Sequence, residues 1–274
     1  MKTTNPVLSR LGQAAERERT AGYGAYSPTG AAPGYGQPYP TAPGYPTAAP
    51  AVQPMTIDDV VVKTVILLGI TGVSAIVAWN VVPDRLTGVA WIGAAVIGLI
   101  IGFVIQFSRM ANPALVVAYA VVEGALVGLV SKTYQEFLGY DGIVLQAVIA
   151  TFGVFFLMAV LYRARVIRAT PKFVRGMYAV IGGVFAVMLI NLVLALFGFN
   201  TGLRDNGPLG YIFSLVCITV AALSFILSFN EIEEGVRMGL PQRYSWTAAF
   251  GILVSLIWLY LEILRLLSYL QSDD

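Results

Sequence analysis

The chain has 274 residues, of which 57% are hydrophobic and only 12% charged, so it has too little polar surface to coat a soluble globule of this size. Its formal net charge of +2 gives no indication of nucleic-acid binding, and its lack of histidine excludes His-based catalytic triads and His-ligated metals. The single cysteine, Cys217, excludes a disulfide framework and a thiolate metal site.

Residues 1–54 differ in composition from the rest of the chain. They hold nine of the fourteen prolines, with Pro-Gly-Tyr at residues 33–35 and again at 43–45. Because this segment has no apolar face to bury, we predict a disordered Pro/Gly/Tyr-rich cytoplasmic tail, followed by a transmembrane domain over residues 55–274. Two interpretations are open: a passive solvated tail, which we favour because composition alone names no partner, and an interaction or self-association arm.

Seven apolar stretches follow one another with hardly a charge inside them. They are residues 64–82, 87–107, 113–130, 143–161, 174–197, 209–229 and 248–267. Each has about the 17 to 25 residues that a helix needs to cross a hydrocarbon core about 30 Å thick. Backbone amides and carbonyls find no water in lipid, so the spans must be helices. We therefore predict an all-α, polytopic membrane protein with seven transmembrane helices in a lipid bilayer.

The basic residues predict the orientation of these spans. If the N-terminus is cytoplasmic, the inside segments hold 13 of the 17 Lys and Arg residues and the outside segments hold four. The loop between the fourth and fifth stretches contributes most to this bias. Cytoplasmic segments of membrane proteins carry such an excess. With seven spans, the C-terminus is then expected outside.

Glu123 is the clearest polar exception, because it lies near the middle of the third stretch. A carboxylate at that depth costs several kcal/mol unless it is paired, protonated or hydrated, so we treat Glu123 as a candidate for the ion pathway or for pH sensing. The alternative is a protonated side chain that hydrogen-bonds to a neighbouring helix, with Gly124 and Gly128 allowing close approach. We favour the functional interpretation, since Ser or Thr would meet a structural need at lower cost.

The last stretch contains a second polar group. Ser255, Glu262 and Arg265 are spaced seven and three residues apart, which places them on one stripe of a helix. Glu262 and Arg265 are predicted to form an ion pair. Two interpretations are open: a pair whose arginine snorkels to the interface, and a pair that belongs to a pore.

Acidic residues gather where the sixth stretch ends. Asn230 is followed by Glu231, Glu233 and Glu234, and these three carboxylates are candidates for weak calcium contacts at a pore mouth. A solvated charge run is the equally open alternative.

No motif indicates an enzyme. The sequence lacks GxxxxGK[ST], HExxH and GxSxG, and the two acids inside the apolar stretches are glutamates rather than the aspartate pair of an intramembrane protease. We therefore expect neither catalysis nor a cofactor.

Several of these features together are similar to a known family. The Glu-Gly of the third stretch, the Ser-Phe-Asn-Glu-Ile at residues 228–232 and the C-terminal Leu-Arg-Leu-Leu that precedes Asp-Asp resemble the Bax inhibitor family of membrane proteins, bacterial branch. The resemblance covers about residues 55–274 and leaves the tail outside.

The resemblance implies a fold in which six helices surround the seventh, and a pH-sensitive calcium leak in a bacterial plasma membrane. In the family, an aspartate at the end of the sixth helix and one in the seventh share a proton, and an arginine near the end of the second helps to latch the pore. The matching positions here are Asn230, Ser255 and Arg109. Two neutral residues cannot share a proton, so this chain departs from the family latch.

We therefore predict a monomeric cation leak channel or transporter, with calcium as the transported ion. The alternative is a regulatory membrane protein that restrains membrane-protein partners, such as a membrane protease, without transporting ions. Calcium flux through liposomes that contain only this protein distinguishes the two.

Overall fold

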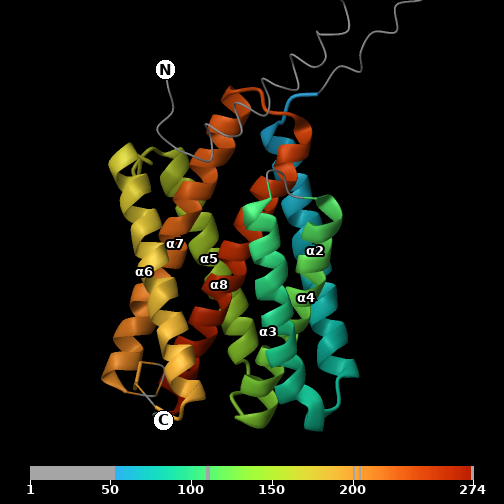
Figure 1. Cartoon of the computed structure of the whole chain (residues 1–274), viewed down its shortest axis with the longest axis vertical. Helices are drawn as coiled ribbons and strands as arrows, with labels where there is room; N and C mark the ends of the chain where they lie inside the picture. The colour runs from blue at the N-terminus through green and yellow to red at the C-terminus, as the bar shows by residue number, and fades with distance from the viewer. Residues whose placement is uncertain (1–52, 109–111, 200, 204, 206, 273–274) are drawn as a thin grey trace, which may run out of the picture.

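The computed structural model of the chain describes residues 53–108, 112–199, 201–203, 205 and 207–272. In this part of the chain, seven long helices form one elongated bundle (Figure 1). They are α2 (Ile57–Val81), α3 (Asp84–Phe107), α4 (Pro113–Lys132), α5 (Ile143–Arg163), α6 (Pro171–Leu196), α7 (Pro208–Arg237) and α8 (Ser245–Ser272). All seven are long and apolar enough to cross a membrane, which confirms the predicted all-α class.

Several helices extend beyond the apolar stretches that predict them. α2 begins seven residues before Thr64, where Thr56 and Asp59 form a capping box. The Thr56 hydroxyl accepts from the Asp59 amide at 3.1 Å, and the Asp59 carboxylate accepts from the Thr56 amide at 3.0 Å. Capping satisfies the free amides of a first turn whatever the polarity of its side chains. Hydropathy therefore marks the span in lipid, and the caps mark the end of the helix.

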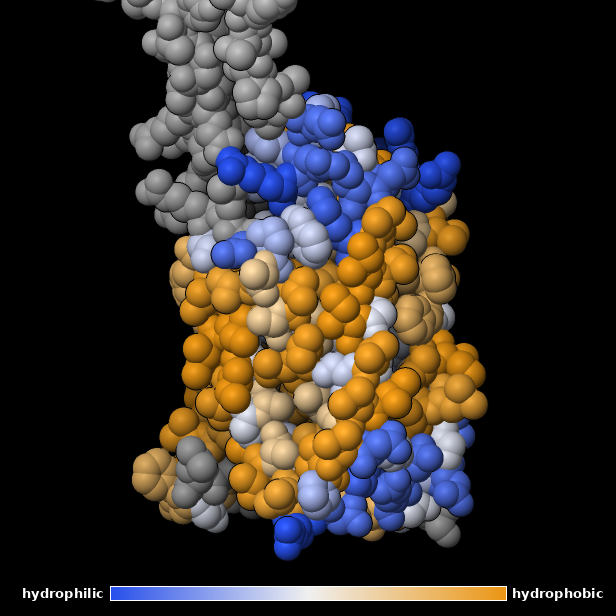
Figure 2. All heavy atoms as spheres, turned by 90° about the vertical axis from the view of Figure 1, so that its right-hand side faces the viewer, coloured by the Kyte–Doolittle hydropathy of each residue, from blue (hydrophilic) through white to orange (hydrophobic). Residues whose placement is uncertain are grey.

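The outer surface carries the polarity of a protein that spans a membrane. Figure 2 shows an apolar band around the middle of the molecule, with hydrophilic residues at both ends. Large apolar side chains within the band are exposed, among them Val73, Ile76 and Leu145. Exposure of such an apolar surface is unfavourable in water but not in lipid, so the bundle belongs in a bilayer.

α8 is the most buried of the seven spans. Its main packing partners are α7, α2, α5 and α4, whereas α3 packs mainly on α4 and α6 on α7. The further expectation that all six helices surround α8 stays a prediction.

α2 and α4 make the most extensive helix contact among the described residues, and two glycines of α4 lie in it. A Cβ atom on Gly124 would lie 2.5 Å from the Thr71 carbonyl oxygen, and one on Gly128 would lie 2.2 Å from that of Ala75. The Ser74 hydroxyl donates to the Val121 carbonyl at 2.6 Å across the same contact. Small residues four apart let two membrane helices approach in this way.

The chain before α2 is fastened to the loop between α7 and α8, residues 238–244, here called the hinge. The Met55 amide donates to the Leu240 carbonyl at 2.7 Å, and the Gln242 amide donates to the Gln53 carbonyl at 2.9 Å. Pro54 pairs with Pro241 in an isolated bridge. Gln53 and Pro54 therefore pack on the bundle, although composition assigned them to the tail. The remainder of that tail, residues 1–52, lies outside the described residues.

Candidate functional site

The polar stripe of α8 faces α7 along most of its length. The Ser224 and Ser255 hydroxyl oxygens lie 3.0 Å apart, and the rings of Tyr211 and Tyr269 lie 5.4 Å apart toward the end of α8. At the hinge side, a Cβ atom on Gly251 would lie 3.8 Å from Ser228 Oγ. The residue numbers of each pair add up to 479 or 480, so the helices run antiparallel in one constant register.

This register aligns two stripes with spacings of four and three residues. The α7 stripe is Gly210, Ser214, Cys217, Ala221, Ser224 and Ser228. The α8 stripe is Gly251, Ser255, Trp258, Glu262, Arg265 and Tyr269. Near the hinge the two stripes bring small residues together, as at Ser224 and Ser255. Further from the hinge, small residues on α7 lie opposite large or charged residues on α8, with Ser214 level with Arg265 and Cys217 level with Glu262. The prediction that Ser255, Glu262 and Arg265 share one face of the helix is confirmed.

Glu262 and Arg265 form an ion pair inside the protein. The Arg265 Nη2 atom lies 2.8 Å from Glu262 Oε1. Arg265 is only 8% exposed and Glu262 only 1%. The guanidinium turns back towards the preceding turn of α8 and is buried within the protein. A charge pair in such surroundings is stable only when its remaining polar atoms are also satisfied.

Several polar atoms beside this pair have no hydrogen bond within the described part of the chain. They are Glu262 Oε2, Arg265 Nη1, Trp258 Nε1 and Ser214 Oγ. All four belong to the facing stripes of α7 and α8, within about two helical turns of Glu262. Buried polar atoms are nearly always bonded, and exceptions indicate a site for water or an ion. Ser214 and Trp258 were not identified as candidates in the sequence analysis. Their spacing of three and four residues from the polar residues of the same stripe could have indicated them.

The structure pairs Ser255 with Ser224 rather than with Asn230. Ser224 Oγ also donates to the Ala221 carbonyl at 2.7 Å. Asn230 lies six residues further along α7 than Ser224, or about 9 Å along the helix axis. Ser255, one of the two positions that the sequence analysis matched to paired aspartates, thus lies in a Ser-Ser contact, and the other, Asn230, is half-buried nearer the hinge. Arg109, the candidate latch arginine, lies outside the described residues.

Glu123 lies elsewhere in the bundle and faces α3. It is buried, and a Cβ atom on Gly98 would lie only 2.5 Å from its Oε1 atom. Tyr119, one turn before Glu123 on α4, packs its ring edge-on against Phe250 of α8 with the centroids 4.9 Å apart. Glu123 therefore lies one helical turn from a contact between α4 and α8. The glycine at position 98 provides the space that the carboxyl group fills.

Two of the three acids near the hinge bind tyrosines of neighbouring helices. Tyr178 of α6 donates to Glu231, and Tyr162 of α5 donates to Glu233 Oε2 at 2.7 Å. Within the described ranges, no group of three His, Cys, Asp or Glu side chains is placed to hold a metal ion. Glu231 and Glu233 therefore tie α7 to α5 and α6. The sequence gives no signal for these pairs beyond tyrosines at the ends of two spans.

The comparison with known proteins agrees with this architecture. No curated protein sequence matches the chain. A family model described as Bax inhibitor 1 like matches residues 5–272. The match begins in the Pro/Gly/Tyr-rich segment, so the expectation that the likeness starts at about residue 55 is wrong. Because the match covers nearly the entire sequence, this chain belongs to the Bax inhibitor 1 like family.

Proposed function

We propose that this protein is a pH-sensitive cation leak channel or transporter, with calcium as the ion. The observation that carries the proposal is the buried Glu262–Arg265 pair, whose second carboxylate oxygen and second guanidinium nitrogen lack hydrogen bonds within the described residues. Ionisable groups inside a membrane bundle are expensive, and they mark ion pathways and proton relays. The pair lies on the α8 stripe that faces the small residues of α7, where a pathway can be hydrated with little rearrangement.

The chemistry of the two stripes suits weak binding of a hard cation. Glu262 Oε2 and the hydroxyl groups of Ser214, Ser224 and Ser255 are oxygen ligands of the kind that calcium prefers. They are fewer than the six to eight ligands of a tight calcium site, and a leak requires an ion to leave as readily as it enters. Arg265 opposes entry while it is close to the pathway, so cation passage requires Glu262 to compensate its charge.

The expected pH dependence follows from the carboxyl group of Glu123. A dry, closed pathway favours its neutral acid and a hydrated, open pathway favours its carboxylate, so protons bias the protein towards closure. Flux should therefore fall as the pH is lowered.

The setting proposed for this activity is a bacterial plasma membrane, with the N-terminus in the cytoplasm and the protein acting as a monomer. The support is the distribution of basic residues. Arg163, Arg168, Lys172 and Arg175 lie between or beside α5 and α6 on the side of the hinge, whereas the ion-paired Lys132 and the exposed Arg85 lie at the other end. An excess of basic residues indicates the cytoplasmic side.

Reconstitution tests the proposal directly. The full chain is purified into liposomes that contain a calcium-sensitive dye, and calcium influx is recorded between pH 5 and pH 8 against protein-free liposomes. Influx that rises with pH is the expected result. Absence of influx at every pH, from protein that is shown to be folded, would favour the non-transporting regulator of membrane proteins instead.

A further inference from the structure

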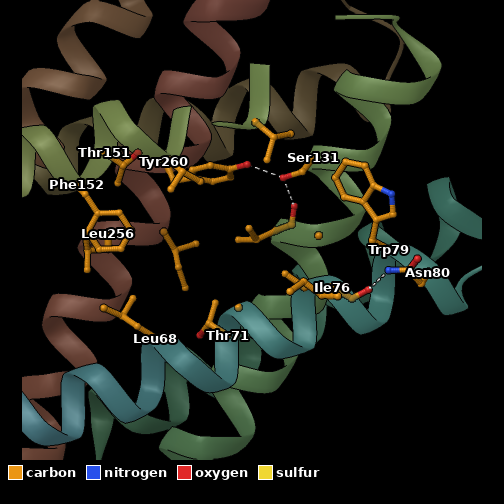
Figure 3. Close-up of a pocket in the computed structure, with 17 residues that line it drawn as sticks. Leu68, Thr71, Ile76, Trp79, Asn80, Ser131, Thr151, Phe152, Leu256 and Tyr260 are labelled. Atoms are coloured by element: carbon orange, nitrogen blue, oxygen red, sulfur yellow. Dashed lines mark hydrogen bonds between the residues drawn. The ribbon is translucent and has the colours of Figure 1, made fainter. Parts of the chain in front are cut away.

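A second feature of the bundle is an apolar groove on the side away from the α7–α8 contact. It has a volume of about 480 Å³, with α2 and α5 as its walls and α4 and α8 as its floor. Figure 3 shows Leu68, Thr71 and Ile76 on one side of the hollow, with Thr151 and Phe152 across from them. Ile76 and Phe152 are also exposed on the outside of the bundle, so the groove opens sideways into the apolar band.

The polar groups in this groove make their hydrogen bonds within the protein. The Thr151 hydroxyl donates to the Ala147 carbonyl at 2.7 Å, and the Thr71 hydroxyl donates to that of Ala120 at 3.3 Å. Tyr260 and Ser131 lie 2.6 Å apart through their oxygens, and Ser131 also donates to the carbonyl of Val127. A cavity whose donors are already satisfied favours an apolar occupant over water or a polar solute.

The length of the groove matches one leaflet of a bilayer. It reaches along α2 from Leu68 to Asn80, twelve residues or about 18 Å at 1.5 Å per residue. Half of a hydrocarbon core about 30 Å thick is about 15 Å. Trp79 lies at the end of the groove nearer the C-terminus of α2, and its Nε1 donates to Glu136 Oε1 at 2.7 Å. Amphipathic rings of this kind are common at the membrane interface. The groove therefore runs from the interface to about the middle of the membrane.

The depth of the groove selects among apolar occupants. Leu256 and Ile257 on its floor are buried, whereas Ile76 and Phe152 at its rim are exposed. A helix of a second copy or of a partner protein is about 10 Å wide, so it would rest on the rim and leave the floor uncontacted. An extended hydrocarbon chain is an apolar occupant slender enough to reach the floor.

We propose that this groove binds a single acyl chain of a bilayer phospholipid, from the leaflet in which Trp79 lies. The acyl chain enters between α2 and α5 and reaches the floor of the groove, which Leu256 and Ile257 of α8 form. The lipid then forms part of the packing between two helices that make few direct contacts with each other. This site is separate from the Glu262–Arg265 pair, and it does not depend on ion transport.

A photoreactive lipid tests the proposal. The full chain is reconstituted in liposomes with phosphatidylcholine that carries a diazirine midway along one acyl chain, and the labelled residues are identified by mass spectrometry after illumination. The expected result is labelling of Leu256 or Ile257 on the floor, besides exposed residues such as Val73 and Leu145. Labelling confined to the exposed residues would overturn the proposal.

Glycines of α2 provide a matched pair of variants. A Cβ atom on Gly72, which lines the groove, or on Gly69, which does not, would meet no atom within 4 Å. Gly72→Leu should fill the groove and lower labelling of the floor at least fivefold, whereas Gly69→Leu should leave it unchanged. Val148→Phe, with the exposed Ile149→Phe as its control, repeats the comparison from α5. Labelling of Leu256 or Ile257 that persists in both Gly72→Leu and Val148→Phe would show that the acyl chain does not bind in the groove.

Discussion

The Glu262 carboxylate and the Arg265 guanidinium lie 2.8 Å apart, one turn from each other on α8, and both are buried. Each group uses one atom in this contact and leaves another without a hydrogen bond to a described residue. An ion pair that is satisfied only in part stabilises a bundle weakly and remains available to water, protons or a cation.

The first prediction separates the stabilising role of this pair from its role in transport. Glu262→Gln leaves the Arg265 charge uncompensated and should lower stability by about 3 to 5 kcal/mol. Glu262→Gln combined with Arg265→Met removes both charges and should recover most of that loss, while calcium flux stays low in both proteins. Thermal unfolding in detergent and liposome flux measure the two effects.

Asp141→Asn serves as the control for that series, because Asp141 is exposed in the loop before α5 and its change removes one carboxylate without touching the pair. It should retain wild-type stability and flux. If the double variant is as unstable as Glu262→Gln, the two charges are not coupled; if it retains wild-type flux, the pathway does not use them.

A second prediction concerns the contact between α2 and α4. Gly128→Ala would place a methyl group 2.2 Å from the Ala75 carbonyl oxygen, so the helices must separate. We expect a loss of about 1 to 3 kcal/mol, typical of overpacking. Gly153→Ala on α5 meets no atom within 4 Å and should be neutral or stabilising by up to about 1 kcal/mol. Equal melting temperatures in detergent for the two variants would contradict this account.

The sequence was sufficient to predict the seven spans, because polar groups are costly in lipid and each span is therefore a continuous run of apolar side chains. It was also sufficient to place Ser255, Glu262 and Arg265 on one face, since helical periodicity is local as well. The partners of these residues were not predictable. Ser224, Tyr178 and Tyr162 meet their partners across helix contacts, and the rotation of each helix in a bundle depends on packing that no single stretch records.

The tail supplies a third prediction. Deletion of residues 1–52 should leave stability and flux nearly unchanged, as expected of a segment without apolar periodicity. Deletion of residues 1–56 also removes the buried Met55 side chain, the Thr56 cap and the bonds to Leu240 and Gln242. Loss of the cap alone costs about 0.5 to 2 kcal/mol, so the longer deletion should lower the melting temperature in detergent. A large effect of the shorter deletion would show that the tail packs on the bundle.

The fourth prediction is the orientation. The basic residues near α5 and α6 favour a cytoplasmic hinge and N-terminus, and an odd number of spans then leaves the C-terminus outside. A reporter fused after Asp274 should be active only on the external side, and one inserted at Asp141 should agree with it. Cytoplasmic activity of the C-terminal fusion would mean that the orientation is reversed or that one apolar helix does not cross.

The last prediction is that Glu123 carries part of the pH dependence that the neutral Asn230 and Ser255 cannot supply. In a dry closed state its neutral acid is favoured, and in a hydrated open state its carboxylate is favoured, so protons should bias the protein towards closure. Glu123→Gln imitates the neutral acid and keeps the size of the side chain that fills the space beside Gly98, so the protein should fold normally.

Flux through Glu123→Gln should accordingly be lower than wild type and flatter between pH 5 and pH 8. Asn230→Asp combined with Ser255→Asp introduces two carboxyl groups and should restore a titrating element, and with it a pH response, to that variant. Normal folding with wild-type flux and wild-type pH dependence would instead make Glu123 a structural group, whose carboxyl group fills the space beside Gly98 of α3.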